Sequence, residues 1–324
     1  MKIVISHRLH DDGMKVLEKG NSQVAITNDG NPKAMLPELL DADGLIIRIG
    51  SIDRETMLQA KNLKVIGRPG VGVDDVDVKT ATELGIPVVI APGANTRSVA
   101  EHAFALMFAC AKDVIRSDNE MRKGNFAIRN SYKAYELNNK TLALIGYGRI
   151  GFILAQMSKA IGMIVKVYDP FVTPQTVKDA GYVYCASLDE AIKDSDVISI
   201  HVPLTKDTRN LISERELSLM HQNTILINCA RGEVIDEIAL TKALEQKQIH
   251  SAGLDVFAHE PVDVSSPLFQ LENVIVSPHM AGQTKEAASG VATMAAEGVI
   301  AVINGERWPY VCNPEAYEHP KWNK

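Results

Sequence analysis

Three polar side chains of different chemistry stand out in the second half of the chain. Arg231, Glu260 and His279 each follow a short run of apolar and β-branched residues. If these runs are parallel strands of an open α/β sheet, the three side chains meet at its carboxyl edge, where such folds hold their ligands. We therefore treat Arg231, Glu260 and His279 as a candidate catalytic set.

This combination suits the reduction of a 2-oxo acid, which needs a hydride on the carbonyl carbon and a proton on its oxygen. A histidine has an unperturbed pKa suited to giving that proton near neutrality, the role predicted for His279. A carboxylate such as Glu260 favours the imidazolium and orients the ring. Arg231 would bind the substrate carboxylate as a fork and stabilise charge growing on the carbonyl oxygen. Taken singly, each residue also suits an ordinary surface or loop position, and only their joint placement favours catalysis.

A glycine-rich segment upstream would supply the hydride carrier. The run Leu142–Ile145 leads into Gly146-Tyr-Gly148-Arg-Ile-Gly151, a GxGxxG pattern between a strand and a helix. The first glycine permits a tight turn, the second lets the backbone approach a pyrophosphate, and the third lets the helix pack closely. The backbone amides of Arg149 and Ile150 at the helix start are the expected phosphate donors. A GxGxxG pattern alone also occurs as a plain turn in other α/β proteins.

An acidic residue at the expected distance strengthens the dinucleotide interpretation. Asp169 ends the next predicted strand, 23 residues after Gly146. A carboxylate there hydrogen-bonds an adenosine ribose and repels the extra phosphate of NADP, so NAD is the predicted cofactor. The alternative for Asp169 is a turn residue before Pro170. Asp255 lies at a strand end where it would hydrogen-bond the nicotinamide carboxamide.

Alternating strand and helix patterns provide the scaffold for these residues. β-branched runs predict strands that alternate with helices, as in βαβ units and doubly wound parallel sheets. The predicted strands are Lys2–Ser6, Val24–Thr27, Gly44–Arg48, Lys64–Gly67, Val88–Ile90, Leu142–Ile145, Ile164–Tyr168, Val197–His201, Thr224–Asn228, Ser251–Leu254 and Val274–Ser277. Long helices are predicted over 96–123 and 284–304.

Two such helices on either side of the second strand set indicate that one domain is inserted into the other. We expect residues 1–96 to start a substrate domain, residues 97–289 to form the cofactor domain, and residues 290–324 to return to the first. The cleft between two domains is the natural place for a ligand.

Composition limits the possible partners. The 324 residues carry a net charge of −6, which argues against a nucleic-acid binder. The four cysteines form no CxxC pair or metal-ligand spacing, so we expect reduced thiols, no bound metal and a cytoplasmic protein. The N-terminal apolar run is followed at once by charged residues and predicts a strand rather than a signal peptide, and no membrane span is expected.

With these residues placed, the sequence resembles the D-2-hydroxyacid dehydrogenase family, in its phosphoglycerate dehydrogenase and hydroxypyruvate reductase branch. The resemblance extends over nearly the whole chain. It is carried by GRPGVGVDDVD at 67–77, APGANTRSVAEH at 91–102, GYGRIG at 146–151, HVPLT at 201–205, NCARG at 228–232, LDVF at 254–257, Glu260-Pro261 and Pro278-His279.

The resemblance implies a Rossmann NAD domain inserted into a flavodoxin-like substrate domain. It assigns catalysis of D-2-hydroxy acid oxidation and 2-oxo acid reduction to Arg231, Glu260 and His279. Besides the glycine loop and Asp169, the implied cofactor contacts are Val71, His201, Val202, Pro203, Thr208, Cys229, Ala230, Asp255 and Gly282. The implied substrate contacts are Arg48, Arg68, Val71, Gly72, Asn95, Arg231 and His279. It also implies a homodimer formed through the helical region 97–123.

Departures from the family leave the substrate open. Ile49-Gly50-Ser51 follows Arg48 without the small hydroxyl residues of the phosphoglycerate branch, and Met-Ala-Gly-Gln-Thr follows His279. The candidates are 3-phosphoglycerate and hydroxypyruvate or glyoxylate, and whether Arg48 and Arg68 bind a phosphate depends on which is used. The sequence ends at Lys324, so feedback through a C-terminal amino-acid-sensing domain is not expected.

Other functions fit less well. An NAD(H)-sensing corepressor-like binding protein with vestigial activity is the main alternative. Formate dehydrogenase is disfavoured because Glu260 stands where that relative has a neutral glutamine. A metal-dependent hydrolase is disfavoured because no HExxH pattern or comparable ligand cluster occurs.

Overall fold

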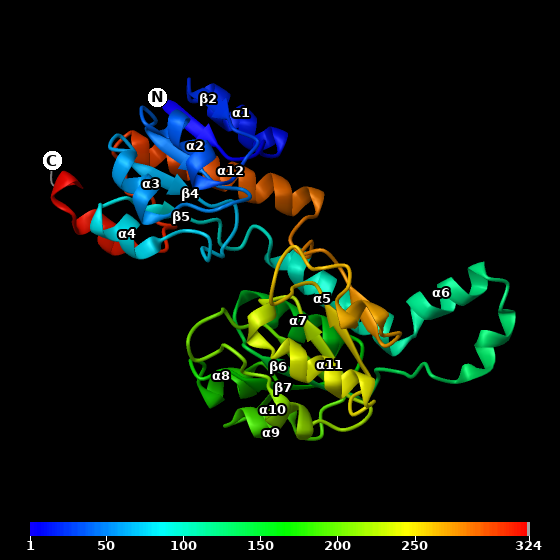
Figure 1. The fold of residues 1–324 in the computed structure, drawn as a ribbon. Coiled ribbons are helices and arrows are strands. Elements are labelled where there is room, and N and C mark those ends of the chain that lie inside the picture. Colours follow the sequence, from blue (N-terminus) through cyan, green and yellow to red (C-terminus); the bar gives the residue numbers. More distant parts are fainter. Residues whose placement is uncertain (323–324) are drawn as a thin grey trace. The chain divides into compact units, whose positions relative to one another are not determined.

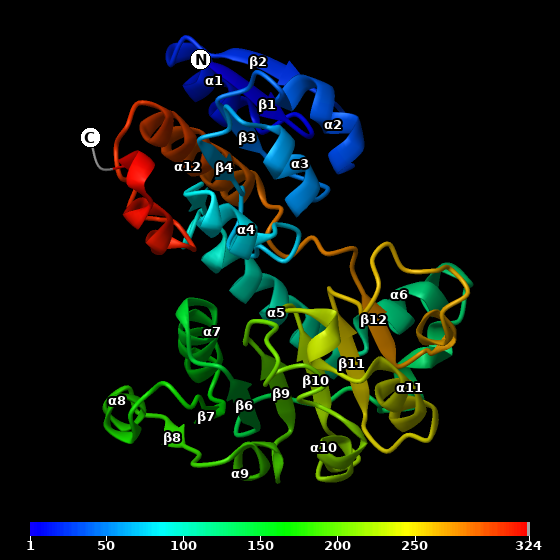
Figure 2. The same ribbon diagram turned by 60° about the vertical axis from the view of Figure 1, so that its left-hand side comes forward.

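The computed structural model describes residues 1–322, which fold into two compact units (Figures 1 and 2). Unit 1 contains Met1–Asn95 and the segment that starts at Gln283, and unit 2 contains Thr96–Gly282. Each unit has its own parallel sheet with helices on both faces. The predicted α/β class with two doubly wound sheets is confirmed.

The sheet of unit 1 has the strand order β2-β1-β3-β4-β5, with every pair parallel. This is the flavodoxin-like order, which reverses direction between β1 and β3. Its strands are β1 (Lys2–Ile5), β2 (Gln23–Ile26), β3 (Gly44–Ile46), β4 (Val65–Gly67) and β5 (Val88–Val89). Its helices are α1 (Asp11–Lys19), α2 (Pro32–Leu39), α3 (Arg54–Gln59), α4 (Val78–Glu83) and α12 (Lys285–Ile303), with the 3-10 turns η4 (Pro314–Glu318) and η5 (Pro320–Trp322).

Alternating side chains of β1 show how this sheet is covered on both faces. Ile3 and Ile5 lie in a buried cluster with Val299 of α12, whereas Val4 lies in a second cluster with Met35 of α2. All five side chains are fully buried. Because neighbouring residues of a strand point to opposite faces, the continuous apolar run of β1 reflects helices on both sides of it.

Helix α12 also bears on the question of a membrane span. Among the described residues it is long and apolar enough to cross a membrane by length and composition alone. However, α12 packs against α1 and against β3, β4 and β5, and Ala295, Ala296 and Val299 are fully buried there. Its position in the core of unit 1 accounts for its apolar composition.

The sheet of unit 2 has the order β12-β11-β10-β9-β6-β7-β8 and is also parallel throughout. Its first six strands in chain order follow the Rossmann arrangement, with the direction reversing between β6 and β9. The strands are β6 (Thr141–Ile145), β7 (Ile164–Tyr168), β8 (Val183–Tyr184), β9 (Val197–Ile200), β10 (Ile225–Asn228), β11 (Ser251–Leu254) and β12 (Val274–Val276).

Helices cover both faces of this second sheet. The helices and 3-10 turns of unit 2 are α5 (Thr96–Ala111), α6 (Val114–Arg122), η1 (Phe126–Ser131), α7 (Arg149–Ala160), α8 (Pro174–Asp179), α9 (Leu188–Ile192), α10 (Glu214–Ser218), η2 (Gly232–Val234), α11 (Glu237–Glu245) and η3 (Pro267–Gln270). Leu142 and Leu144 of β6 pack in a cluster with α5 and α7, and Ala143 and Ile145 pack with α9, α10 and α11. The strand ends are therefore held from both sides.

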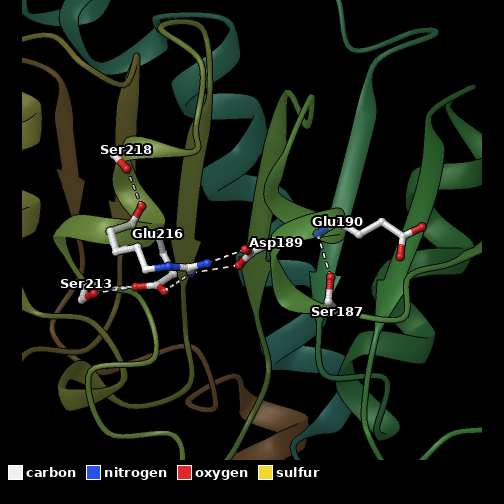
Figure 3. A network of polar contacts seen from close by, with 7 residues as sticks. Ser187, Asp189, Glu190, Ser213, Glu216 and Ser218 are labelled. Atoms are coloured by element: carbon white, nitrogen blue, oxygen red, sulfur yellow. Dashed lines mark hydrogen bonds and ion pairs between the residues drawn. The ribbon is translucent and has the colours of Figure 1, made fainter.

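Short helices α9 and α10 are linked at the surface of unit 2. Ser187 caps α9, and the backbone N–H and hydroxyl of Ser213 donate to Glu216 at the start of α10 (Figure 3). Arg215 pairs with both Glu216 and Asp189 of α9. The pair of Arg215 with Asp189 is largely exposed and contributes little to stability by itself, so we assign this network to the local packing of the two helices.

Every strand range predicted from the sequence overlaps an observed strand, but two elements differ. Strand β8 was not predicted, because its two residues are too short to show a pattern. The predicted continuous helix over 96–123 is wrong, since α5 ends at Ala111 and α6 begins at Val114. Asp113 between them has a left-handed backbone with φ of 52°, and its carboxylate pairs with Arg116. No residue of α6 is buried, so packing in the core does not hold α6 in line with α5.

The return to unit 1 starts at Gln283, whereas the sequence placed it at residue 290. Thr284 caps α12 by accepting a hydrogen bond from the N–H of Ala287 at 3.2 Å. The helix packs on α1, and the hydroxyl of Ser289 donates to Asp12 of α1 at 2.7 Å, so the whole of α12 belongs to unit 1. The expected return segment 290–324 includes residues 323 and 324, which lie outside the described residues.

Candidate active site

The glycine loop joins β6 to α7 at the point where the sheet of unit 2 reverses its strand order. Gly146 has a φ of 100°, and a Cβ there would lie 2.6 Å from the carbonyl oxygen of His201. A Cβ on Gly151 would lie 2.4 Å from the carbonyl oxygen of Gly146. Both positions therefore require glycine for the protein's own packing.

Gly148 differs from its two neighbours in the loop. A Cβ added at Gly148 would meet no described atom within 4 Å, so the protein itself does not require glycine there. Gly148 precedes α7, whose first N–H groups, from Arg149 and Ile150, have no partner within the helix. Open space beside these donors and the positive end of the helix dipole suits a pyrophosphate. The residues present therefore fit the predicted dinucleotide.

Asp169 is connected directly to this loop. One oxygen of its carboxylate accepts the N–H of Tyr147 at 2.8 Å, and the other accepts the N–H of Phe171 at 2.8 Å. Asp169 directly follows β7, the strand beside β6. The two backbone donors hold the carboxylate next to the glycine loop, where a ribose hydroxyl adjoining the pyrophosphate would lie.

The other predicted cofactor residues of unit 2 lie at the same sheet edge. His201, Val202 and Pro203 follow β9, and Cys229 and Ala230 follow β10. Burial lowers the pKa of His201 to about 4, so its ring is neutral near pH 7, and its Nε2 lies 2.8 Å from the hydroxyl of Ser199. Burial raises the pKa of the Cys229 thiol well above its usual range, which favours the neutral thiol there.

The remaining residues predicted to contact the cofactor do not directly follow a strand of unit 2. Thr208 donates to the carbonyl oxygen of Pro203 at 2.6 Å and so closes the loop after β9. Gly282 is the last residue of unit 2, and Val71 belongs to unit 1, with a side chain that is 47% exposed. Among the described residues there is no group of three or more His, Cys, Asp and Glu side chains that could hold a metal ion.

The structure brings His279 and Glu260 into direct contact. Nδ1 of His279 lies 2.7 Å from Oε2 of Glu260. The hydrogen bond to Glu260 raises the pKa of His279 above its ordinary value, against burial and the charge of Arg231. Burial alone would raise the pKa of Glu260, but hydrogen bonds from His279 and the Phe257 amide, with the charges of His279 and Arg231, lower it. Both shifts favour an imidazolium paired with a carboxylate, which is the protonation state that a proton donor requires.

Arg231 lies close enough for its charge to act on both members of this pair. It follows β10, and its Nη1 donates to the carbonyl oxygen of Ala230 at 2.7 Å. The side chain of Asn228 donates to the backbone carbonyl of Arg231 at 2.9 Å and fixes the turn. A guanidinium beside an imidazolium suits an anionic substrate, because both cations attract it.

The loops that carry Arg231 and Glu260 pack against each other. A Cβ on Gly232 would lie 1.9 Å from the carbonyl carbon of Phe257, so no larger residue fits there. The carboxylate of Glu237 accepts the N–H of Ala258 at 2.9 Å. Oε1 of Glu260 accepts the N–H of Phe257 at 3.0 Å. These contacts hold the two loops in one relative position.

Asp255 has a role in this structure that the sequence did not indicate. Its side chain is fully buried and accepts the Ser277 hydroxyl at 2.6 Å and the N–H groups of Met280 and Ala281 at 2.9 and 2.8 Å. The carboxylate therefore supports the loop that carries His279. Ser277 and His102, which contact each other, were not predicted as functional residues. The sequence offered one signal for His102, its place at the end of the block 91–102, and none for Ser277.

The predicted substrate residues come from both units. Arg48, Arg68, Val71, Gly72 and Asn95 belong to unit 1, and Arg231 and His279 belong to unit 2. The guanidinium of Arg68 pairs with Asp75, at 3.0 Å from Nε and 2.8 Å from Nη2. Its Nη1 also donates to the backbone carbonyls of Ile47 and Arg48. Arg68 therefore joins the ends of β3 and β4 to the following loop, and most of its donors are used inside unit 1.

Arg48 is placed differently from Arg68. Its side chain is exposed, and its Nη1 donates to the backbone carbonyl of Arg8 at 3.2 Å. The backbone N–H of Arg48 donates to the hydroxyl of Ser6 at 3.0 Å, which fixes the start of the loop after β3. Of these two arginines, Arg48 is the one whose charge remains accessible to an anion.

The contrast between Gly148 and Gly151 makes a test of the cofactor site possible. We expect Gly151→Ala to destabilise unit 2, because the new Cβ would collide with backbone, and Gly148→Ala to fold normally but bind NADH more weakly. Thermal unfolding and NADH titration measure the two effects. A Gly148→Ala variant with parental NADH affinity would contradict the placement of the pyrophosphate.

Comparisons with known proteins place this architecture among dehydrogenases. The family model described as "D-isomer specific 2-hydroxyacid dehydrogenase, NAD binding domain" matches residues 104–281. The D-3-phosphoglycerate dehydrogenase of Methanocaldococcus jannaschii is 40% identical over 97% of this chain, and the chain covers 59% of that protein. The glyoxylate reductase of Thermococcus litoralis is 37% identical over 97% of both chains. This chain thus spans about half to three fifths of the length of the phosphoglycerate dehydrogenases that it matches.

A solved structure shows the same relationship. The D-lactate dehydrogenase of Aquifex aeolicus, crystallised with NAD and lactic acid, is 32% identical. It superimposes with a TM-score of 0.85 over 94% of this chain and 96% of that one. The similarity therefore includes both units as well as the residues of the family model.

Proposed function

Because the chain belongs to the D-isomer specific 2-hydroxyacid dehydrogenase family, with NAD as its cofactor, we propose that it interconverts a small D-2-hydroxy acid and its 2-oxo acid. The observation that carries this proposal is the contact of 2.7 Å between His279 and Glu260, with the charge of Arg231 beside them. A proton donor and a carboxylate-binding cation are thereby held at the sheet edge that also carries the glycine loop.

The chain's own residues would divide the reaction as follows. The bound cofactor supplies the hydride. The imidazolium of His279 gives a proton to the carbonyl oxygen of the 2-oxo acid, and Glu260 keeps that ring oriented and charged. Arg231 binds the substrate carboxylate and opposes negative charge growing on the carbonyl oxygen. In the oxidation direction His279 is neutral at the start and takes the proton from the hydroxyl group.

We propose glyoxylate or hydroxypyruvate as the substrate class rather than a phosphorylated acid. The support is twofold. Arg68 has most of its donors taken by Asp75, Ile47 and Arg48, which leaves Arg48 as the more accessible cation of the pair. In addition, a relative that the chain covers over 97% of its length is a glyoxylate reductase.

A substrate panel with NADH tests both parts of the proposal. Glyoxylate, hydroxypyruvate, phosphohydroxypyruvate, pyruvate and bulkier 2-oxo acids are compared by kcat/KM, in the parent and in Arg48→Gln. We expect the small unphosphorylated acids to rank first and to be little affected by Arg48→Gln. A preference for phosphohydroxypyruvate that Arg48→Gln removes would reverse the substrate proposal. Bound NADH without turnover of any acid would instead favour an NAD(H)-sensing binding protein.

The pH dependence of reduction is expected to report on the pair of His279 and Glu260. Because reduction needs protonated His279, kcat/KM should fall as pH rises through the pKa of His279, which Glu260 raises. In Glu260→Gln the raising carboxylate is lost, so the fall should move to lower pH. Glu245→Gln, at an exposed position of α11, is the matched control. Superimposable profiles for Glu260→Gln and the parent would refute this coupling.

Asp169 is expected to set the preference for NADH over NADPH. Asp169→Asn keeps an acceptor for the Tyr147 amide and removes the charge, whereas Asp169→Ala removes both. We therefore expect both variants to accept NADPH better relative to NADH, and Asp169→Asn to keep the parental unfolding temperature. The ratio of kcat/KM for the two cofactors is the measurement. An unchanged ratio in both variants would place the ribose contact elsewhere.

We further propose a homodimer formed through the region 97–123 and the turn that follows it. No side chain of α6 or η1 is buried, and in Figure 1 these elements extend away from the sheet of unit 2. Val114, Ile115, Met121 and Phe126 are each about half exposed or more. An apolar surface of this kind on a helix suits a second copy of the chain. Light scattering on the parent and on Ile115→Glu tests this, and a monomeric parent would overturn it.

The remaining partner and location proposals rest on composition. All four cysteines are free thiols, which supports the reducing environment of the cytoplasm. The net charge of −6 supports the proposal that neither nucleic acid nor a membrane surface is a partner. Cell fractionation and a nucleic-acid binding assay at low salt test these two statements.

A further inference from the structure

The loop from Ser277 to Ala281 has an unusual conformation at its centre. His279 has a left-handed backbone with φ of 50°, which residues other than glycine rarely adopt. Its N–H donates to the backbone carbonyls of Asp255 at 2.8 Å and Ser277 at 3.0 Å. A conformation of this kind persists only where the surrounding contacts enforce it. The residues that enforce it therefore also decide where the imidazole of His279 lies.

Helix α5 holds both ends of this loop. The hydroxyl of Ser98 donates to the carbonyl oxygen of Ala281 at 2.5 Å. Nε2 of His102 lies 2.8 Å from the hydroxyl oxygen of Ser277. Ser98 and His102 are four residues apart, so they share one face of α5. Ser98 is buried and His102 is largely buried, which protects both contacts from water.

Counting hydrogens gives these contacts a direction. The Ser277 hydroxyl has one hydrogen, and the fully buried carboxylate of Asp255 can only accept, so Ser277 donates to it at 2.6 Å. The Ser277 oxygen must then accept from His102, which places a hydrogen on Nε2 of His102. The result is a chain of donors from His102 through Ser277 to Asp255. Asp255 in turn accepts the N–H groups of Met280 and Ala281, the two residues that directly follow His279.

We propose that His102 is a positioning residue for His279. It acts through Ser277 and Asp255 to hold the loop in the conformation that places Nδ1 of His279 against Glu260. Without the donor at position 102, the Ser277 hydroxyl loses its fixed orientation and the loop loses its attachment to α5 at that end. The kinetic part of this inference rests on the proposed dehydrogenase function, whereas the structural part does not.

Three variants distinguish a role of His102 in positioning the loop through its hydrogen bond from a role in packing alone. His102→Leu keeps bulk and removes the donor. His102→Gln keeps a donor, because its side-chain amide N–H can reach the Ser277 oxygen. His221→Ala is the matched control, since His221 lies outside this network and its ring accepts the N–H of Asn223.

Two readouts are needed, one of them independent of turnover. The first is kcat and KM for the preferred 2-oxo acid, with the NADH dissociation constant. The second is the pKa of the His279 imidazole from NMR titration, with its signal assigned by its absence in His279→Gln. For His102→Leu we expect kcat to fall by about 10- to 100-fold, as for a reacting group displaced by a fraction of an ångström to one ångström. The pKa of His279 should fall towards its ordinary value, while His102→Gln and His221→Ala stay near the parent in both readouts.

The outcomes separate cleanly. Parental kcat and parental His279 pKa in His102→Leu would overturn the proposal. Equal loss of kcat in His102→Leu and His102→Gln, with an unchanged His279 pKa, would also overturn it and assign His102 to packing. If His102→Leu does not fold, Ser277→Ala cuts the same chain from the loop side and is judged by the same two readouts. If the parent turns over no acid, the proposed function fails, and the His279 titration still decides the positioning role.

Discussion

Replacing His279 by glutamine is expected to lower kcat for 2-oxo acid reduction by about 10²- to 10⁴-fold, the range of general acid catalysis. Glutamine keeps a polar group near Glu260 but has no proton to give near neutral pH. The glycine loop and Asp169 lie at other strand ends, so NADH affinity should stay close to that of the parent. Stopped-flow NADH oxidation and NADH titration measure the two quantities.

The backbone at this position calls for a second variant. Because His279 has a φ of 50°, a glutamine there is strained, whereas asparagine adopts this region more readily. His279→Asn should therefore fold as well as the parent and lose turnover to the same extent as His279→Gln. If either variant retained parental turnover, another group would have to supply the proton.

The second large effect is expected for Arg231→Lys. We expect kcat/KM for the 2-oxo acid to fall by about 10²-fold, towards the lower end of the losses seen when an oxyanion donor is removed. Lysine keeps the charge but not the planar fork that binds a carboxylate through two parallel hydrogen bonds. Steady-state kinetics with the preferred acid provide the measurement.

The same variant separates two roles of Arg231. Its positive charge opposes protonation of His279 and helps to lower the pKa of Glu260. Since lysine retains that charge, the pH at which reduction declines should move little even though kcat/KM drops. Arg209→Lys is a matched control. The side chain of Arg209 is mostly exposed and pairs with Glu233, a residue two positions after Arg231. Unchanged kcat and KM in Arg231→Lys would remove Arg231 from the catalytic set.

These two experiments also bear on the positioning role of His102. If His279→Gln lost turnover while His102→Leu kept parental turnover and the parental pKa of His279, the assignment of His279 as proton donor would stand. The positioning role of His102 would be refuted. Loss in both, with rescue by His102→Gln, would make the position of the imidazole as important as its chemistry. The pKa of His279 connects the two results, because it depends on the contact with Glu260.

The elements that could be predicted from the sequence are those specified by local patterns. The apolar run at Lys2–Ser6 predicted a strand of a doubly wound sheet, and Ile3, Val4 and Ile5 of β1 are buried in two different clusters. The GxGxxG spacing predicted a strand, a tight turn and a helix, and β6, Gly146 and α7 follow in that order. The break at Asp113 was missed because a long apolar helix pattern does not show where packing stops supporting it.

By itself, then, the sequence determined the fold class, the cofactor loop and the three strand ends that carry Arg231, Glu260 and His279. These depend on period, spacing and backbone preferences within short segments. Only the tertiary structure decided the uses of Asp255, Arg68 and His102. Asp255 is a buried acceptor for the loop that carries His279, and the guanidinium of Arg68 pairs with Asp75. His102 contacts Ser277, which lies 175 positions away in the sequence. The role of a buried polar side chain depends on the donors and acceptors that packing brings within hydrogen-bonding distance of it. A local sequence pattern does not show which partners those will be.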